Sequence, residues 1–205
     1  MDTQNTSTDV GEDRHVIATY VSDMLALERH ISAPVDAQLA SQDHQDYAQA
    51  IALIQQIKTT CDSHIAALEQ LLSTRGGNAA SPIKSAVSTV LGGGAAVINK
   101  MRKTKVSKSL RDDSTALSLA AISYTMLNAT ALGLGDQATA ALAKRHLDDV
   151  APLIVSISKA MPTVVLQELR DTGENVAVSA SASSQQQTGD SWSDSNIGAS
   201  NGGKL

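Results

Sequence analysis

Apolar residues recur at every third or fourth position along most of the chain, which is the pattern of amphipathic α-helices. The pattern predicts four long helices, at about residues 13–33, 46–74, 114–133 and 136–160. Stretches in which apolar and polar residues alternate, a pattern typical of strands, are scarce. The sequence therefore predicts an all-α fold.

Proline and glycine residues indicate where these helices end. We expect Pro34 to end or kink the first helix and Pro152 to kink the fourth. The pair Gly76–Gly77 should stop the second helix, Gly133–Gly135 the third, and Met161–Pro162 the fourth. The links within each pair of helices are short, so the two members of a pair should be antiparallel neighbours.

A long connection, residues 76–113, separates the first pair of helices from the second. It is long for a loop, and we expect it to be a crossover that contains short helices. Residues 1–11 are polar and acidic, and residues 172–205 are rich in Ser, Gln and Gly, so both are expected to be disordered. One helical domain, residues 12–171, remains between them.

The composition indicates a soluble protein with an aliphatic core. The chain has no Phe, one Trp and three Tyr, so Leu, Ile, Val, Ala and Met must fill the interior. A single cysteine, Cys61, excludes an intrachain disulfide and is typical of a reducing compartment. Neither a signal peptide nor an uninterrupted apolar run of membrane-spanning length is visible. These features predict a cytoplasmic protein without a transmembrane segment.

Charge is distributed unevenly along the chain. The formal net charge is −5, which argues against a general nucleic-acid binder, and we expect no specific nucleic-acid recognition. Between Arg75 and Arg111, however, there are eight basic residues and no acidic one. This crossover is either a solvated segment that balances an acidic bundle or a surface for an anionic partner, such as a membrane surface. The candidate residues are Lys100, Arg102, Lys103, Lys105, Lys108 and Arg111.

Several polar residues occupy the apolar faces of the predicted helices. Glu28 should point inward, and because a buried unpaired carboxylate is costly, it needs a partner. One hypothesis is a metal site that Glu28 shares with His64, His146 and Asp149, which would accept iron, manganese or zinc. The other is a buried hydrogen-bonded or ionic cluster. Tyr124 either donates its hydroxyl to Glu28 or Asp149 or only packs in the core.

Two antiparallel helices, a long crossover and two further antiparallel helices resemble the ferritin-like superfamily. The segment Asp23–His30 resembles the helix that supplies its first metal carboxylate, and Asp62–Glu69 is similar to the His-bearing segment of small bacterial ferritin-like stress proteins. Leu117–Pro152 resembles a divergent helix pair of the same superfamily. The resemblance implies an up-down four-helix bundle and a bacterial, stress-associated role.

The sequence departs from the metal-ligand pattern of that superfamily. Cys61 stands where the Glu of a Glu-x-x-His pair would precede His64, although a Cys donor would favour zinc. No acidic residue occurs between Ser114 and Gly135, and His146-x-x-Asp149 has the ligand order reversed. An oxidase is therefore not expected. We expect a non-enzymatic binding or structural protein that forms a homo-oligomer, a dimer or larger; a protein with one retained metal is the alternative.

Overall fold

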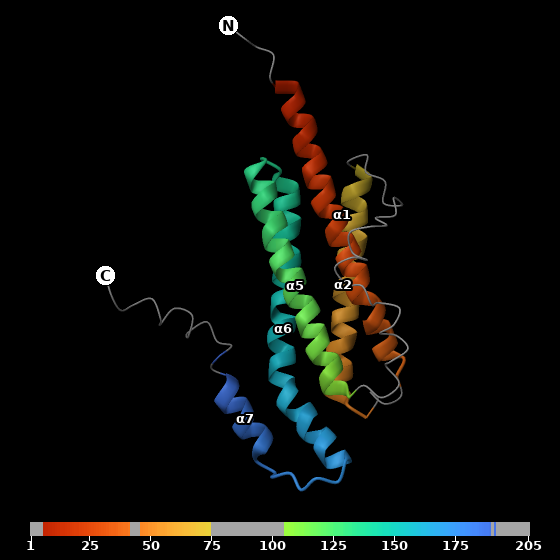
Figure 1. Ribbon diagram of the computed structural model, residues 1–205, viewed down its shortest axis with the longest axis vertical. Helices are drawn as coiled ribbons and strands as arrows, with labels where there is room; N and C mark the ends of the chain where they lie inside the picture. Colours follow the sequence, from red (N-terminus) through yellow and green to blue (C-terminus); the bar gives the residue numbers. More distant parts are fainter. Residues whose placement is uncertain (1–5, 42–45, 75–104, 190, 192–205) are drawn as a thin grey trace, which may run out of the picture.

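The structure is a computed structural model that describes residues 6–41, 46–74, 105–189 and 191, with side chains from residue 15 onward. Every regular element in these ranges is an α-helix, and they contain no strand (Figure 1). The predicted all-α fold is confirmed. There are four long helices and one short one in the described part: α1 (Thr6–Leu39), α2 (Ala48–Thr74), α5 (Val106–Gly133), α6 (Gln137–Asp171) and α7 (Ala180–Gly189).

The four long helices lie side by side along the length of the molecule (Figure 1). Helix α1 packs against α2 and α5, and α6 packs against α5 and α2. Helices α1 and α6 run in one direction, and α2 and α5 run in the other. Because α2 and α5 are parallel, the end of α2 and the start of α5 lie at opposite ends of the molecule.

Buried residues recur in each long helix at alternating spacings of three and four, which is the heptad pattern of helices that pack nearly parallel to one another. Most of these residues are aliphatic, and they form one continuous core. In α2 the buried set is Ala50, Ile54, Ile57, Cys61, His64, Leu68 and Leu72. In α5 it includes Val106, Leu110, Asp113, Leu117, Ala120, Tyr124, Leu127 and Ala131.

The tight turn between α5 and α6 follows from its local sequence. Helix α5 ends at Gly133, and Gly135 adopts a φ of 74°, a left-handed conformation that glycine accepts without strain. Asp136 then caps α6 by accepting hydrogen bonds from the Thr139 amide (3.1 Å) and hydroxyl (2.7 Å). This turn makes the two helices antiparallel neighbours, as the sequence predicted for this pair.

The helices are longer than the proline positions predicted. Helix α1 continues through Pro34 to Leu39, and α6 continues through Pro152 and Pro162 to Asp171. The expected end of the fourth helix at Met161–Pro162 is therefore wrong. A proline removes one backbone hydrogen bond, but buried residues beyond it, such as Val164, keep the following turns packed against the core.

Both predicted disordered ends contain helix in the described part of the chain. Helix α1 begins at Thr6, inside residues 1–11, and α7 lies within residues 172–205 and contacts α6. The polar composition of α7 explains the missed prediction, because it has no apolar stripe to reveal a helix. The short helices expected in the crossover lie outside the described residues.

The third long helix begins earlier than predicted. It starts at Val106 rather than near residue 114, because its first turn is anchored to α6. The carboxylate of Glu168 accepts hydrogen bonds from the Ser107 amide (2.8 Å) and hydroxyl (2.7 Å). Val106 and Leu110 are buried in the core beside this anchor. The segment 106–113, predicted as crossover, is therefore part of α5.

Helices α5 and α6 are also long and apolar enough to cross a membrane, on length and composition alone. Core helices of soluble proteins pass the same test, and both helices contribute residues to the core that they share with α1 and α2. The expected absence of a transmembrane segment therefore stays a prediction.

Candidate functional site: a buried polar layer

Each of the four long helices contributes one polar residue to a single layer of the core. These residues are Glu28 from α1, His64 from α2, Tyr124 from α5 and His146 from α6, and none is more than 4% exposed. Each occupies a buried heptad position between aliphatic neighbours, so the backbone pattern that buries leucine elsewhere buries these side chains here. The prediction that Glu28 points inward and has a partner is confirmed.

Hydrogen bonds join all four side chains. The Tyr124 hydroxyl donates to Glu28 Oε1 (2.6 Å), and His64 Nδ1 lies 2.8 Å from the same oxygen. Because the Tyr124 hydroxyl has only one proton, it must accept from His146 Nδ1, which lies 3.0 Å away. His146 therefore carries its proton on Nδ1. Of the two roles considered for Tyr124, the hydrogen bond to Glu28 is confirmed.

The aromatic rings of the layer pack tightly on one another. The imidazoles of His64 and His146 are stacked, with centroids 3.8 Å apart and planes 10° from parallel. The Tyr124 ring meets His146 edge-on, at 5.0 Å and 89°. Ring stacking and hydrogen bonds together fix the orientation of each side chain in the layer.

The environment of the layer shifts two pKa values in ways that preserve its hydrogen bonds. Burial, followed by the charge of the stacked His64 ring and of Arg145, lowers the pKa of His146 from 6.5 to about 3. Burial and the neighbouring Glu28 carboxylate raise the pKa of Tyr124 far above its usual range. At neutral pH, His146 is therefore uncharged and Tyr124 keeps the proton that it donates.

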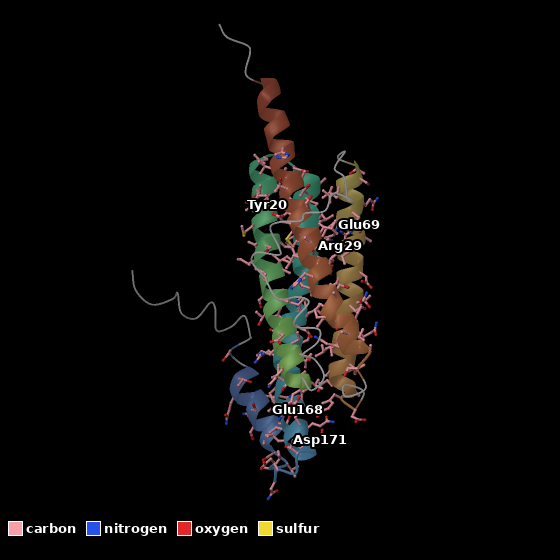
Figure 2. The ribbon with its side chains drawn as sticks, turned by 45° about the vertical axis from the view of Figure 1, so that its right-hand side comes forward. Tyr20, Arg29, Glu69, Glu168 and Asp171 are labelled. Carbon is pink, nitrogen blue, oxygen red and sulfur yellow. The ribbon has the colours of Figure 1, made fainter. Side chains whose placement is uncertain are left out.

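Asp149 lies at the edge of the layer. Its Oδ2 is 3.3 Å from His64 Nε2, and 60% of its side chain is exposed. The four residues predicted as a metal set thus come together, but Asp149 contacts only the outer side of His64. The nearby Arg29 pairs with Glu69 across the surfaces of α1 and α2, so its charge is not directed at Glu28 (Figure 2).

The arrangement of this layer does not fit a metal ion. A histidine nitrogen binds a metal in the plane of its ring, and two nearly parallel rings 3.8 Å apart share no such plane. Within the described residues, no group of three or more His, Cys, Asp or Glu side chains is placed to hold an ion. A metal would require the rings of His64 and His146 to move apart.

Cys61 lies one turn before His64 and is buried, with no disulfide. Burial, followed by the charge of Glu28, raises the pKa of its thiol far above the usual range. The thiol is therefore protonated at neutral pH, and Cys61 packs as a small residue of the aliphatic core.

A second buried polar contact was not foreseen from the sequence. Gln38 Nε2 of α1 donates to Asp113 Oδ1 of α5 at 2.8 Å, and both residues are buried. The remaining oxygen of each side chain, Gln38 Oε1 and Asp113 Oδ2, has no hydrogen-bond partner. Burial raises the pKa of Asp113 from 3.8 to about 7. A proton on Asp113 would provide the donor that the two unpaired oxygens lack.

The predicted anion surface is only partly visible. Lys100, Arg102 and Lys103 lie outside the described residues. Lys105 directly precedes α5, Lys108 lies in its first turn and Arg111 in its second, and all three are exposed. Arg111 pairs with its neighbour Asp112 at 2.7 Å.

No family model matches the chain, and no curated protein matches it. Among solved structures, it is similar to the crystal structure of a protein from Xanthomonas campestris pv. campestris, with 15% sequence identity and a TM-score of 0.64. The match covers 80% of this chain and 99% of that chain. At this identity, the likeness shows a shared fold and carries no argument about function.

Proposed function

We propose that this chain is a ferritin-like four-helix-bundle protein of the cytoplasm with a non-enzymatic binding or stress-associated structural role. In this proposal, a hydrogen-bonded layer stands where ferritin-like proteins hold their metals. Support comes from the directions of the helices. The first pair is α1 and α2, and the second pair, α5 and α6, starts at the end of the molecule opposite to the one where α2 ends. The observation that carries the proposal is the Tyr124 hydroxyl, which joins Glu28 to His146.

The chemistry of the layer supports a structural role over a catalytic one. Its four side chains hydrogen-bond to one another, His64 Nε2 also reaches Asp149 at the edge of the layer, and the burial of the four gives a substrate no access. One polar layer in an aliphatic bundle penalises any slippage of the helices, because slippage would leave a buried carboxylate or imidazole unpaired. The layer therefore selects one register of the four helices.

The second candidate is a metalloprotein. The observation that favours it is that Glu28, His64, His146 and Asp149 lie close together. Elemental mass spectrometry of the purified full chain separates the two candidates, with the Glu28→Ala, His64→Ala double variant beside it. The proposal expects no stoichiometric iron, manganese or zinc in either protein. A near-stoichiometric metal that is lost in the double variant would establish the metalloprotein instead.

We also propose that the protein forms a homodimer through the outward face of α5. Leu119, Ile122, Met126 and Leu132 are 44–57% exposed on this helix. No charged residue occurs from Ser114 to Gly135, and the exposed polar side chains among these four are the small hydroxyl residues Ser118 and Thr125. An uncharged face that exposes several large apolar side chains is typical of a protein interface.

The order of side chains along this face suits a second copy in the antiparallel direction. A two-fold axis at Tyr124 would place Leu119 against Ala129 of the second copy and Ile122 against Met126. The small Ala129 opposite Leu119 lets the helices approach closely, and Ile122 and Met126 supply apolar contact at the centre of the interface. Such an interface is its own complement, which a two-fold dimer requires.

A further inference from the structure

A hollow of about 700 Å³ lies between the first turns of α5, the second half of α6 and helix α7. On the α6 side its wall is apolar except for Ser158 and includes Met161, Val165 and Leu166. On the α7 side its wall consists of small and hydroxyl-bearing residues, among them Ser184 and Thr188. Its volume falls within the range of about 300–1,000 Å³ that is usual for small-molecule sites.

The hollow exists because α7 covers α6 without filling the space beside it. Helix α7 contains only Ala, Ser, Gln, Thr and Gly, and none of its residues is buried. Polar contacts hold it in place: the hydroxyls of Thr163 and Ser181 lie 2.9 Å apart, and Gln185 Nε2 donates to the Lys159 carbonyl at 3.0 Å. An apolar wall that faces an unfilled space loses packing contacts, so an apolar occupant would stabilise this arrangement.

The charge at the hollow favours a ligand with an anionic group. Among the described residues that line it, Arg111 is the only charged one, and 65% of its side chain is exposed. Its guanidinium therefore lies at the solvent edge of the hollow. Its pairing with Asp112, itself 62% exposed, is a surface ion pair and is easily exchanged for another anion.

We propose that the hollow binds a long-chain carboxylate, with the carboxylate on Arg111 and the acyl chain against Met161, Val165 and Leu166. This inference rests on the proposed role as a binding protein and names what is bound. The carboxylate would be the anionic partner that the sequence predicted for Arg111. The buried layer and the α5 face take no part in it.

Calorimetric titration of the full chain with saturated carboxylates of eight to fourteen carbons, below their micelle concentrations, tests the proposal. Each added methylene should tighten binding about fourfold until the hollow is full. Arg111→Gln should weaken carboxylate binding about tenfold or more and leave binding of the alcohol of equal chain length unchanged. Arg170→Gln, at an exposed cation outside the hollow, is the matched control and should change neither.

Ser184→Trp places a bulky side chain in the hollow and should abolish binding of both carboxylate and alcohol. Absence of binding by the unaltered chain, affinity that does not depend on chain length, or an equal loss of alcohol binding in Arg111→Gln would overturn the proposal. If Ser184→Trp fails to fold, the comparison of carboxylate and alcohol binding by Arg111→Gln still tests the proposal. A negative result would leave the metal analysis and the α5 dimer untouched, because those experiments depend on other residues.

Discussion

Tyr124 donates its hydroxyl proton to Glu28 Oε1 at 2.6 Å, across 96 positions of sequence and between two different helices. This bond gives the only acidic residue of the layer its second donor, beside His64. It also fixes the Tyr124 hydroxyl as an acceptor for His146. One side chain of α5 thus links a carboxylate on α1 to an imidazole on α6.

Replacement of Tyr124 by Phe should lower the free energy of unfolding by about 3 kcal/mol, because it removes a hydrogen bond to a buried carboxylate and leaves the His146 donor unpaired. Urea denaturation followed by far-ultraviolet circular dichroism measures this change. Tyr20→Phe is the control, since Tyr20 is only partly buried and its hydroxyl makes no hydrogen bond with any described residue. This variant should stay within about 0.5 kcal/mol of the unaltered chain. Equal effects of the two variants would contradict the role of the layer.

The Gln38–Asp113 pair predicts a stability that depends on pH. The folded chain holds the Asp113 proton up to about pH 7, whereas an unfolded carboxyl releases it near 3.8. Because the folded state binds more protons in this window, this group makes the free energy of unfolding fall as pH rises from about 4 to about 7. The stabilisation that comes from the Asp113 proton is complete below about pH 4 and is lost above about pH 7.

Asp113→Asn should remove this dependence. The new amide accepts from Gln38 Nε2 and donates to Gln38 Oε1, so Gln38 Oε1 gains a donor and the unpaired oxygen of Asp113 is replaced by that donor at every pH. We expect the variant to be more stable than the unaltered chain at pH 8 and to lack the falling slope between pH 4 and 7. Asp112→Asn, at the adjacent exposed residue, should keep the slope. Thermal unfolding at a series of pH values decides between these outcomes.

The α5 dimer predicts a specific cross-link. In the antiparallel register, a Leu119→Cys, Ala129→Cys double variant should form disulfide-linked dimers on mild oxidation, because each new cysteine faces the other in the second copy. Leu119→Cys alone should not cross-link, since it faces Ala129. A dimer linked through the single cysteine would indicate a parallel interface and contradict the register.

Charge on the same face should prevent association. Ile122→Glu buries a carboxylate in the proposed interface, so we expect a monomer by sedimentation equilibrium, with secondary structure retained. Gln55→Glu adds the same charge on the exposed side of α2 and should leave the dimer intact. A monomeric unaltered chain would refute the α5 interface directly.

The helices and the inward positions of the polar layer could be predicted from the sequence because one periodicity governs both. The spacing that buries Ile57 and Leu68 also buries His64 between them. The meeting of Glu28, His64, His146 and Asp149 was one of the predicted alternatives, but the pattern could not decide between a metal and direct hydrogen bonds. It shows which side chains point inward and says nothing about the distances between them. The joining role of Tyr124 had one usable signal: it is a large polar residue on the buried side of Ser114–Gly135, a stretch without charged residues.

Other predictions failed where two local signals competed. Proline at position 34 or 162 favours the end of a helix, but the apolar residues that follow still pack into the core and extend the helix. The third helix was predicted to start near residue 114 but begins at Val106. Its start is anchored by Ser107, whose partner Glu168 lies beyond residue 160, the predicted end of the fourth helix.

The central claim is that hydrogen bonds, and no metal, close the layer around Tyr124. Nitrogen-15 NMR of the histidine-labelled chain tests it most directly, because the ring shifts report protonation, tautomer and metal ligation separately. The account predicts that His146 is neutral and protonated on Nδ1 from pH 8 down to pH 5, in keeping with its lowered pKa, and that neither zinc nor a chelator changes its signals. A His146 nitrogen that shifts on addition of zinc or on chelation would contradict the account and identify the layer as a metal site.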